Sequence, residues 1–227
     1  MKIIMFGLIV LGLANFAPGA DKAALDNRVR KLTGKLEAMQ RNADKAIPAE
    51  RLRKAHGIVL LDRTKAGFIF AFQGGGGVAT VKDPKTGKWG PLAFVEANEA
   101  SLGVQIGGEQ TFMVILLMGT NATRLLTESH FEFGGEARGT AGDASAGEEG
   151  KVSSPGGSVL VFADRKGLYG GAAVKGGAIT PDEDANTAYY GGYKTMNEIL
   201  FEKKLEQSEA ASKLIAKLEE YSKENKK

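Results

Sequence analysis

The chain has 227 residues, of which 43% are apolar, so it is long enough to bury a core of its own. Thirty lysines and arginines stand against 27 aspartates and glutamates, and the net charge of +3 is too small to indicate nucleic-acid binding. The sequence contains no cysteine, which excludes disulfides, thiolate metal sites, thiol catalysis and lipid attachment through a cysteine.

The N-terminus has the residue order of a secretory signal. A basic residue precedes an apolar run over residues 3–13, and small residues follow it. This order predicts a signal peptide over residues 1–20, cut after Gly19 or Ala20. An uncleaved anchor is the alternative, but a polar residue and a proline interrupt a stretch that is already short for a span of about 20 apolar residues. We therefore expect residues 21–227 to form a single domain that is exported, either periplasmic or secreted.

An amphipathic helix is predicted next, because apolar residues recur every three or four positions from Leu25 to Met39. We expect it to end before Ile47-Pro48, since the residue preceding a proline is pushed out of the helical region. Basic residues flank the apolar stripe and continue beyond the helix. We name these residues the predicted basic surface: Arg28, Lys31, Lys35, Arg51, Arg53, Lys54 and Lys65. This pattern is typical of membrane-surface helices, but it also fits a solvated helix packed on a core.

From Gly57 to Thr180, short runs of Val, Ile and Phe alternate with glycines, which predicts strands and turns. Twenty-six of the 31 glycines lie between Gly67 and Gly192, and glycine inside strands marks bulges, bends or close backbone contact. The predicted strands are Ile58–Leu61, Gly67–Phe72, Val78–Lys82, Leu92–Glu96, Leu102–Ile106, Phe112–Met118, His130–Glu136, Ser158–Ala163 and Leu168–Val174.

The connections and the C-terminal region have their own signals. Asp83–Gly87 has the composition of a hairpin turn, and Asn121–Leu126 fits a helical turn inserted between strands. Gly139–Gly157 has little to bury, so we expect a mobile loop or an irregular connection there. Helical periodicity returns beyond Gly192. The predicted fold class is α+β, with a bent, mainly antiparallel, glycine-rich sheet or partly closed barrel framed by N- and C-terminal helices.

Motifs for catalysis or metal binding are poorly supported. His56 and His130 are the only histidines and have no metal-ligand spacing, and no serine lies in a G-x-S-x-G motif. A hydrolase built on either histidine is therefore the weakest hypothesis. We predict no enzymatic activity, no metal and no cofactor.

Two other motifs have structural alternatives. Gly74–Gly77 fits the start of a dinucleotide-binding motif, but a strand pattern follows where a helix is required. This run is either a tight turn or bulge, or a curve of backbone N–H groups around an anion. Asp182, Asp184 and Asn186 imitate a calcium loop that lacks its glycine and its closing glutamate, so we expect the two aspartates to cap a short helical segment.

Several motifs occur together in a specific order, and the sequence resembles the SYLF domain family on their joint presence. They are Ile47-Pro48, Ala55–Val59, Lys65–Phe70, Trp89–Leu92, Gly103–Glu109, Lys166–Gly171, and Asn186 before Tyr190-Gly191. The resemblance covers roughly residues 25 to 220. It implies binding of acidic lipids through a basic surface that includes the N-terminal helical part, and some fungal members also bind and bundle actin.

These observations together predict a non-enzymatic protein that docks reversibly on anionic phospholipid membranes. The expected partner is an anionic phospholipid or membrane surface, with peripheral membrane association and no nucleic acid. The alternative is a structural or adaptor protein that binds another envelope protein and has only incidental lipid affinity. Phe68, Phe70 and Phe72 alternate onto one side of a strand, where they belong to the core or line an acyl-chain cavity.

Overall fold

The computed structural model describes residues 21–67, 71–101, 107–133, 151–154, 157–167, 177–202 and 204–223. Its α-helices are α1 (Lys22–Arg41), α2 (Ala49–Lys54), α3 (Thr120–Arg124), α4 (Glu183–Tyr190) and α5 (Glu209–Tyr221), with a 3-10 turn η1 (Leu125–Thr127) and a π-helical turn η2 (Glu198–Glu202). Its strands are β1 (Gly57–Gly67), β2 (Ala71–Val81), β3 (Ala93–Ser101), β4 (Gly107–Leu117), β5 (Phe131–Phe133), β6 (Lys151–Ser154), β7 (Gly157–Gly167) and β8 (Gly177–Pro181).

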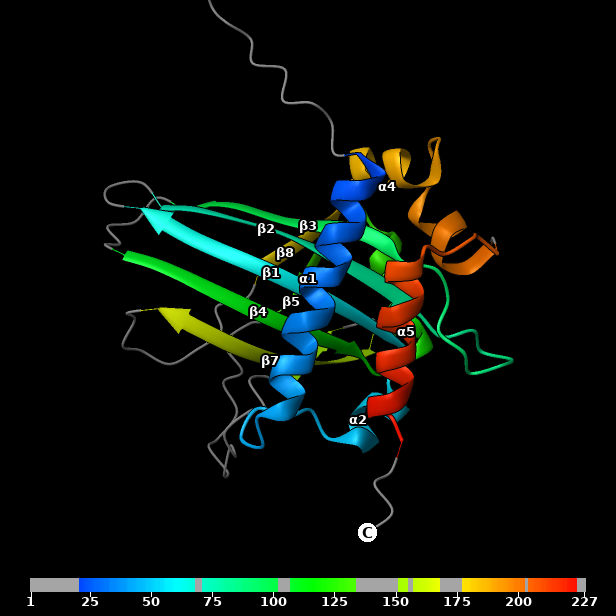
Figure 1. The fold of residues 1–227 in the computed structure, drawn as a ribbon, viewed down its shortest axis with the longest axis horizontal. Helices are drawn as coiled ribbons and strands as arrows, with labels where there is room; N and C mark the ends of the chain where they lie inside the picture. Colours follow the sequence, from blue (N-terminus) through cyan, green and yellow to red (C-terminus); the bar gives the residue numbers. More distant parts are fainter. Residues whose placement is uncertain are drawn as a thin grey trace, which may run out of the picture.

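The strands form one curved antiparallel sheet in the order β5-β8-β3-β2-β1-β4-β7-β6. The central strand β1 pairs with β2 from Gly57↔Val81 to Gly67↔Ala71, and with β4 along its whole length. Helices from both ends of the chain pack against the sheet, and Figure 1 shows α1 and α5 side by side across one of its faces. The predicted α+β class with a bent antiparallel sheet is therefore confirmed.

The glycine run of β2 lies within the paired sheet. Gly74–Gly77 pair with β1 on one side and β3 on the other without a break in register. A Cβ at Gly75 would lie 2.4 Å from the carbonyl oxygen of Asp62, and one at Gly77 would lie 2.3 Å from that of Leu60. Glycine therefore permits a close approach of β1 and β2. The predicted tight turn or bulge is wrong, and so is the anion-binding curve, because these glycines lie within a paired strand.

Alternation along the strands divides the core into two layers. Ile58 and Leu60 of β1 face α1, α4 and α5, while Val59 and Leu61 face the opposite side. The second layer is closed by α3, η1 and η2, together with side chains such as Phe131. Both faces of the central strands are thus buried, so the sheet is a structural frame covered on each side.

The predicted elements differ from the observed ones mainly at their ends. Helix α1 ends at Arg41, which confirms the expected end before Ile47-Pro48, and in the loop that follows the Gln40 side-chain amide bonds both backbone groups of Ile47. The predicted strand Gly67–Phe72 is wrong as a single strand, because Gly67 ends β1 and pairs antiparallel with Ala71, the first residue of β2. Helix α2 was not predicted.

Two local predictions are confirmed. The hairpin turn at Asp83–Gly87 is present, with Gly87 at a φ of 68° that favours glycine. The helical turn at Asn121–Leu126 corresponds to α3 and η1.

Some predictions concern residues outside the described ranges. These are the signal peptide over residues 1–20, the strands Leu102–Ile106 and Leu168–Val174, and the side chains of Phe68, Phe70 and Phe72. Of the expected loop Gly139–Gly157, the described residues are 151–154, which form strand β6, and Gly157, which begins β7.

Candidate functional site: the basic residues of α1 and α2

Helix α1 is fixed to the sheet by its apolar face. Asp21 caps its N-terminus, accepting the N–H of Ala24 at 2.7 Å. Its apolar stripe is almost fully buried and consists of Leu25, Val29, Leu32, Leu36 and Met39. Burial of each such side chain contributes about 1.5–3 kcal/mol. Moving α1 off the sheet would expose to water the apolar residues that it covers, so α1 is part of the folded core and its basic flank must be considered on that basis.

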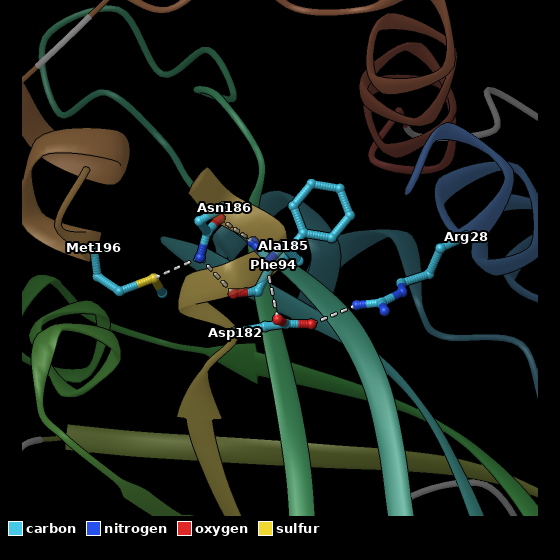
Figure 2. A network of polar contacts seen from close by, with 6 residues as sticks. All are labelled: Arg28, Phe94, Asp182, Ala185, Asn186 and Met196. Atoms are coloured by element: carbon cyan, nitrogen blue, oxygen red, sulfur yellow. Dashed lines mark hydrogen bonds and ion pairs between the residues drawn. The ribbon is translucent and has the colours of Figure 1, made fainter. Parts of the chain in front are cut away.

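Arg28 is directed toward the sheet. Its Nη1 lies 2.7 Å from Oδ2 of Asp182, and its guanidinium lies 5.7 Å from the ring centre of Phe94. The guanidinium also covers Gly76, where an added Cβ would lie 3.2 Å from Arg28 Cζ. Figure 2 shows the Arg28 side chain pointing at the carboxylate of Asp182. Its charge is therefore matched by a carboxylate within the chain.

The next sheet-facing cations are matched in the same way. Lys35 Nζ lies 2.6 Å from Oδ2 of Asp62 on β1, and Lys45, in the loop after α1, pairs with Asp164 on β7. Lys31, by contrast, is exposed on the outer side of α1. Of the predicted basic residues on α1, two therefore link the helix to the rest of the fold and one faces solvent.

A polar network connects α1 with α4 and β3, as Figure 2 shows. The side chain of Asn186, only 2% exposed, accepts the N–H of Phe94 at 2.8 Å and donates to its carbonyl oxygen at 2.9 Å. Asp182 caps α4 by accepting the N–H of Ala185 at 3.0 Å, which confirms the capping prediction for this residue. Asp184 is exposed. Within the described ranges, no group of three or more His, Asp and Glu side chains could hold a metal ion.

Two tyrosines extend this connection from α4. Tyr190 donates its hydroxyl to the carbonyl oxygen of Leu92, and burial raises its pKa well above the usual range. Tyr189 donates to Ser208 at 2.8 Å, and Ser208 donates to Asp26 on α1 at 2.6 Å. Burial also raises the pKa of Tyr189. Both phenols therefore act as neutral donors that tie α4 to its neighbours.

Helix α2 presents its cations differently. Leu52 is fully buried, while Arg51, Arg53 and Lys54 are exposed. Lys54 contacts Glu50 one turn earlier at 2.6 Å, a solvent-exposed pair of little energetic weight. The backbone of Lys65 lies in β1, which pairs with β4 at that position. The structure thus brings the three α2 cations together and separates them from the sheet-facing cations of α1.

Lys82 supports the C-terminal end of α2. Its Nζ donates to the carbonyl oxygens of Leu52 at 3.1 Å and Arg53 at 2.8 Å, and it lies 4.5 Å from the ring centre of Trp89. Burial lowers the pKa of this ammonium group. A cation at the C-terminus of a helix is favourable, because it complements the free carbonyl groups.

The described residues offer neither a membrane span nor room for a lipid chain at the crevice near Val95. None of the helices in the described ranges is long and apolar enough to cross a bilayer. The crevice, which Phe131 and Ile179 also line, leaves no room for a water molecule.

The Ysc84 family, described as "Las17-binding protein actin regulator", matches residues 98–221. The chain belongs to the Ysc84 (SYLF) family. The resemblance seen in the sequence is therefore confirmed, and the family description names a binding protein rather than a reaction.

Curated relatives of this family occur in yeast and mammals. The LAS seventeen-binding protein 3 of Saccharomyces cerevisiae is 31% identical over 195 residues, which are 84% of this chain and 42% of the yeast protein. The SH3 domain-containing YSC84-like protein 1 of Homo sapiens is 28% identical over 180 residues, covering 78% of this chain and 51% of the human protein. The chain thus spans about half the length of these relatives. No solved structure matches it.

Several structural residues were missed by the sequence analysis. Asn186 was noted only as a motif residue, and no local pattern indicates that its amide pairs with a strand 92 residues away. Arg63 is 4% exposed on the face opposite α1, where it contacts Met113 Sδ at 3.8 Å. Lys82 was predicted only as the last residue of the strand Val78–Lys82, and its contacts with α2 were not predicted. Only α2 had a usable signal: a proline before it, an acidic first turn and a basic last turn.

Proposed function

We propose that this chain is a non-enzymatic module that docks reversibly on anionic phospholipid membranes, and that α2 rather than the sheet-facing side of α1 makes the contact. The supporting observation is the exposure of Arg51, Arg53 and Lys54 together on one short helix. Arg28 and Lys35 are held in part-buried ion pairs at 2.7 and 2.6 Å between α1 and the rest of the fold. The ion pair of Lys54 with Glu50 on α2 is instead exposed to solvent.

The energetic argument favours weak, reversible binding. A cation near an anionic surface contributes about 1 kcal/mol, so three on α2 give about 3 kcal/mol, and salt screens this attraction. The predicted signal over residues 1–20 makes the proposed location a cell envelope. The anionic phospholipids of that envelope are then the proposed ligand.

Vesicle flotation tests the proposal. We expect the purified protein to float with anionic vesicles at low salt, to float less at high salt, and to stay behind with neutral vesicles. The variant Arg51→Glu, Lys54→Glu should bind anionic vesicles at least about tenfold more weakly, because it removes two cations and adds two anions. Lys22→Glu, Arg30→Glu changes charge equally on the first half of α1 and should keep binding. Failure of the wild-type protein to bind the anionic vesicles would refute the proposal.

Protein binding is the second candidate, and the family description favours it, since it names a Las17-binding protein. On this alternative, lipid affinity is incidental. Recovery of one stoichiometric protein partner at high salt, from a chain that does not bind vesicles, would support the second candidate over the first.

A further inference from the structure

The turn between β2 and β3 is closed by hydrogen bonds and carries two exposed lysines. The Asp83 carboxylate accepts the N–H groups of Lys85 at 2.7 Å and Thr86 at 2.9 Å, and Gly87 donates its N–H to the Asp83 carbonyl at 2.8 Å. The N–H of Asp83 in turn donates to the carbonyl of Lys88 at 2.9 Å. These backbone bonds fix the turn while the side chains of Lys85 and Lys88 stay exposed.

The turn leaves the sheet beside α2. Gly57, just after α2, pairs with Val81, just before the turn, and the N–H of Lys82 donates to the carbonyl of His56 at 2.8 Å. The Lys82 side chain then reaches the last carbonyls of α2. Figure 1 shows the turn projecting from the end of the sheet where β1 begins. We name residues 49–56 and 82–89 together the α2–turn surface.

The charge of the α2–turn surface is strongly positive. It contains six lysines and arginines and two carboxylates, a formal charge of +4, whereas the whole chain carries +3. Backbone N–H groups bond one carboxylate, that of Asp83, and Lys54 pairs with the other, that of Glu50. The surface ends at Gly90. The side-chain amide of Gln207 donates to the Gly90 carbonyl oxygen, and the neighbouring Glu206 is exposed.

We propose that the α2–turn surface is a single docking surface for anionic phospholipid bilayers, in which Lys85 and Lys88 bind headgroups together with the cations of α2. The inference rests on the proposed function and adds the turn to the site. Lys82 is a positioning residue here, because its ammonium group contacts α2 and Trp89 and holds the two halves together. Five exposed cations on two joined elements would meet the bilayer at one end of the sheet.

Trp89 provides a direct signal from this surface. It is the only tryptophan of the chain, it is 6% exposed, and it packs under the Lys82 ammonium. Its fluorescence therefore reports events at the base of the turn without an added label.

The test is a titration of the full chain and its variants with vesicles of phosphatidylcholine mixed with phosphatidylglycerol, followed by Trp89 emission and by sedimentation. We expect Lys85→Gln, Lys88→Gln to bind about 30-fold more weakly than wild type, since each cation is worth about fivefold. Lys22→Gln, Arg30→Gln, which removes two exposed cations from α1, should bind within about twofold of wild type. Circular dichroism checks that each variant is folded.

The outcomes separate the two proposals. If wild type binds and Lys85→Gln, Lys88→Gln binds equally well, the turn is not part of the site, while membrane docking stands. An equal loss in the α1 control would show that only net charge matters and would also overturn the inference. If wild type does not bind, both proposals fail.

Discussion

Helix α1 and the α2–turn surface both carry basic side chains, but different groups lie opposite them. The sheet-facing cations of α1 meet the carboxylates of Asp182 and Asp62 over 154 and 27 residues of sequence. Five of the six α2–turn cations are exposed, and the two carboxylates among them lie on their own elements. A basic amphipathic helix therefore cannot be identified as a binding surface from its composition alone, because its cations can serve to attach the helix to the fold.

The largest expected effect on stability comes from removing an apolar contact of α1. Leu36→Ala removes a fully buried side chain and should lower the free energy of unfolding by about 3 kcal/mol, from lost burial and the cavity left behind. Urea unfolding followed by Trp89 fluorescence measures this. A loss below about 1 kcal/mol would mean that α1 is only loosely attached and could leave the sheet at a membrane.

A charge reversal on α1 tests the comparison at one ion pair, that of Lys35 with Asp62. Lys35→Glu would place a carboxylate beside Asp62, which already has one buried oxygen without a hydrogen-bond partner. We expect a loss of about 1–2 kcal/mol, moderated by partial solvent exposure. Lys35→Glu, Asp62→Lys should recover part of it. Lys54→Glu, the matched change on α2, should leave the urea midpoint nearly unchanged, and equal effects at both positions would contradict the contrast.

Alkaline pH gives a smaller effect at the α4 end of α1. Burial raises the pKa of Tyr189 and Tyr190, so the folded state favours the neutral phenols. Their contribution is fully present below the unfolded pKa of about 10 and decreases as pH rises above it, because the unfolded chain ionises first. Tyr190→Phe should cost about 1 kcal/mol at pH 7 and flatten the stability decline between about pH 9.5 and 11, measured by urea unfolding. An unchanged slope would assign the decline to other groups.

The elements whose signals are local in the sequence were predicted correctly. The α1 stripe from Leu25 to Met39 has a helical period, and the Asp83–Gly87 turn has residues that suit its backbone, so both were predictable. The glycine density predicted a bent sheet, and close backbone contact is observed at Gly75 and Gly77. It failed at Gly74–Gly77, because a run of glycines does not show whether the chain turns or continues as a strand.

The candidate site was less predictable, because its properties depend on residues distant in sequence. Arg28 and Lys54 look alike in the sequence, and only the folded chain shows that the first meets Asp182 while the second faces solvent. Helix α2 has six residues, too few for a periodic signal. The turn was recognised as a turn, yet its position beside α2 depends on the pairing of β1 with β2.

The glycine run of β2 also determines which sequence changes the protein can accept. Gly75 and Gly77 face backbone carbonyl oxygens of β1, which cannot move without breaking the sheet, so any side chain there is excluded. Gly76 faces the guanidinium of Arg28, the far end of a flexible side chain, and alanine could be accommodated by a small shift. The run of four glycines thus contains positions of very different mutational tolerance. A saturation mutagenesis library over β2 should separate these positions by the group that each glycine faces.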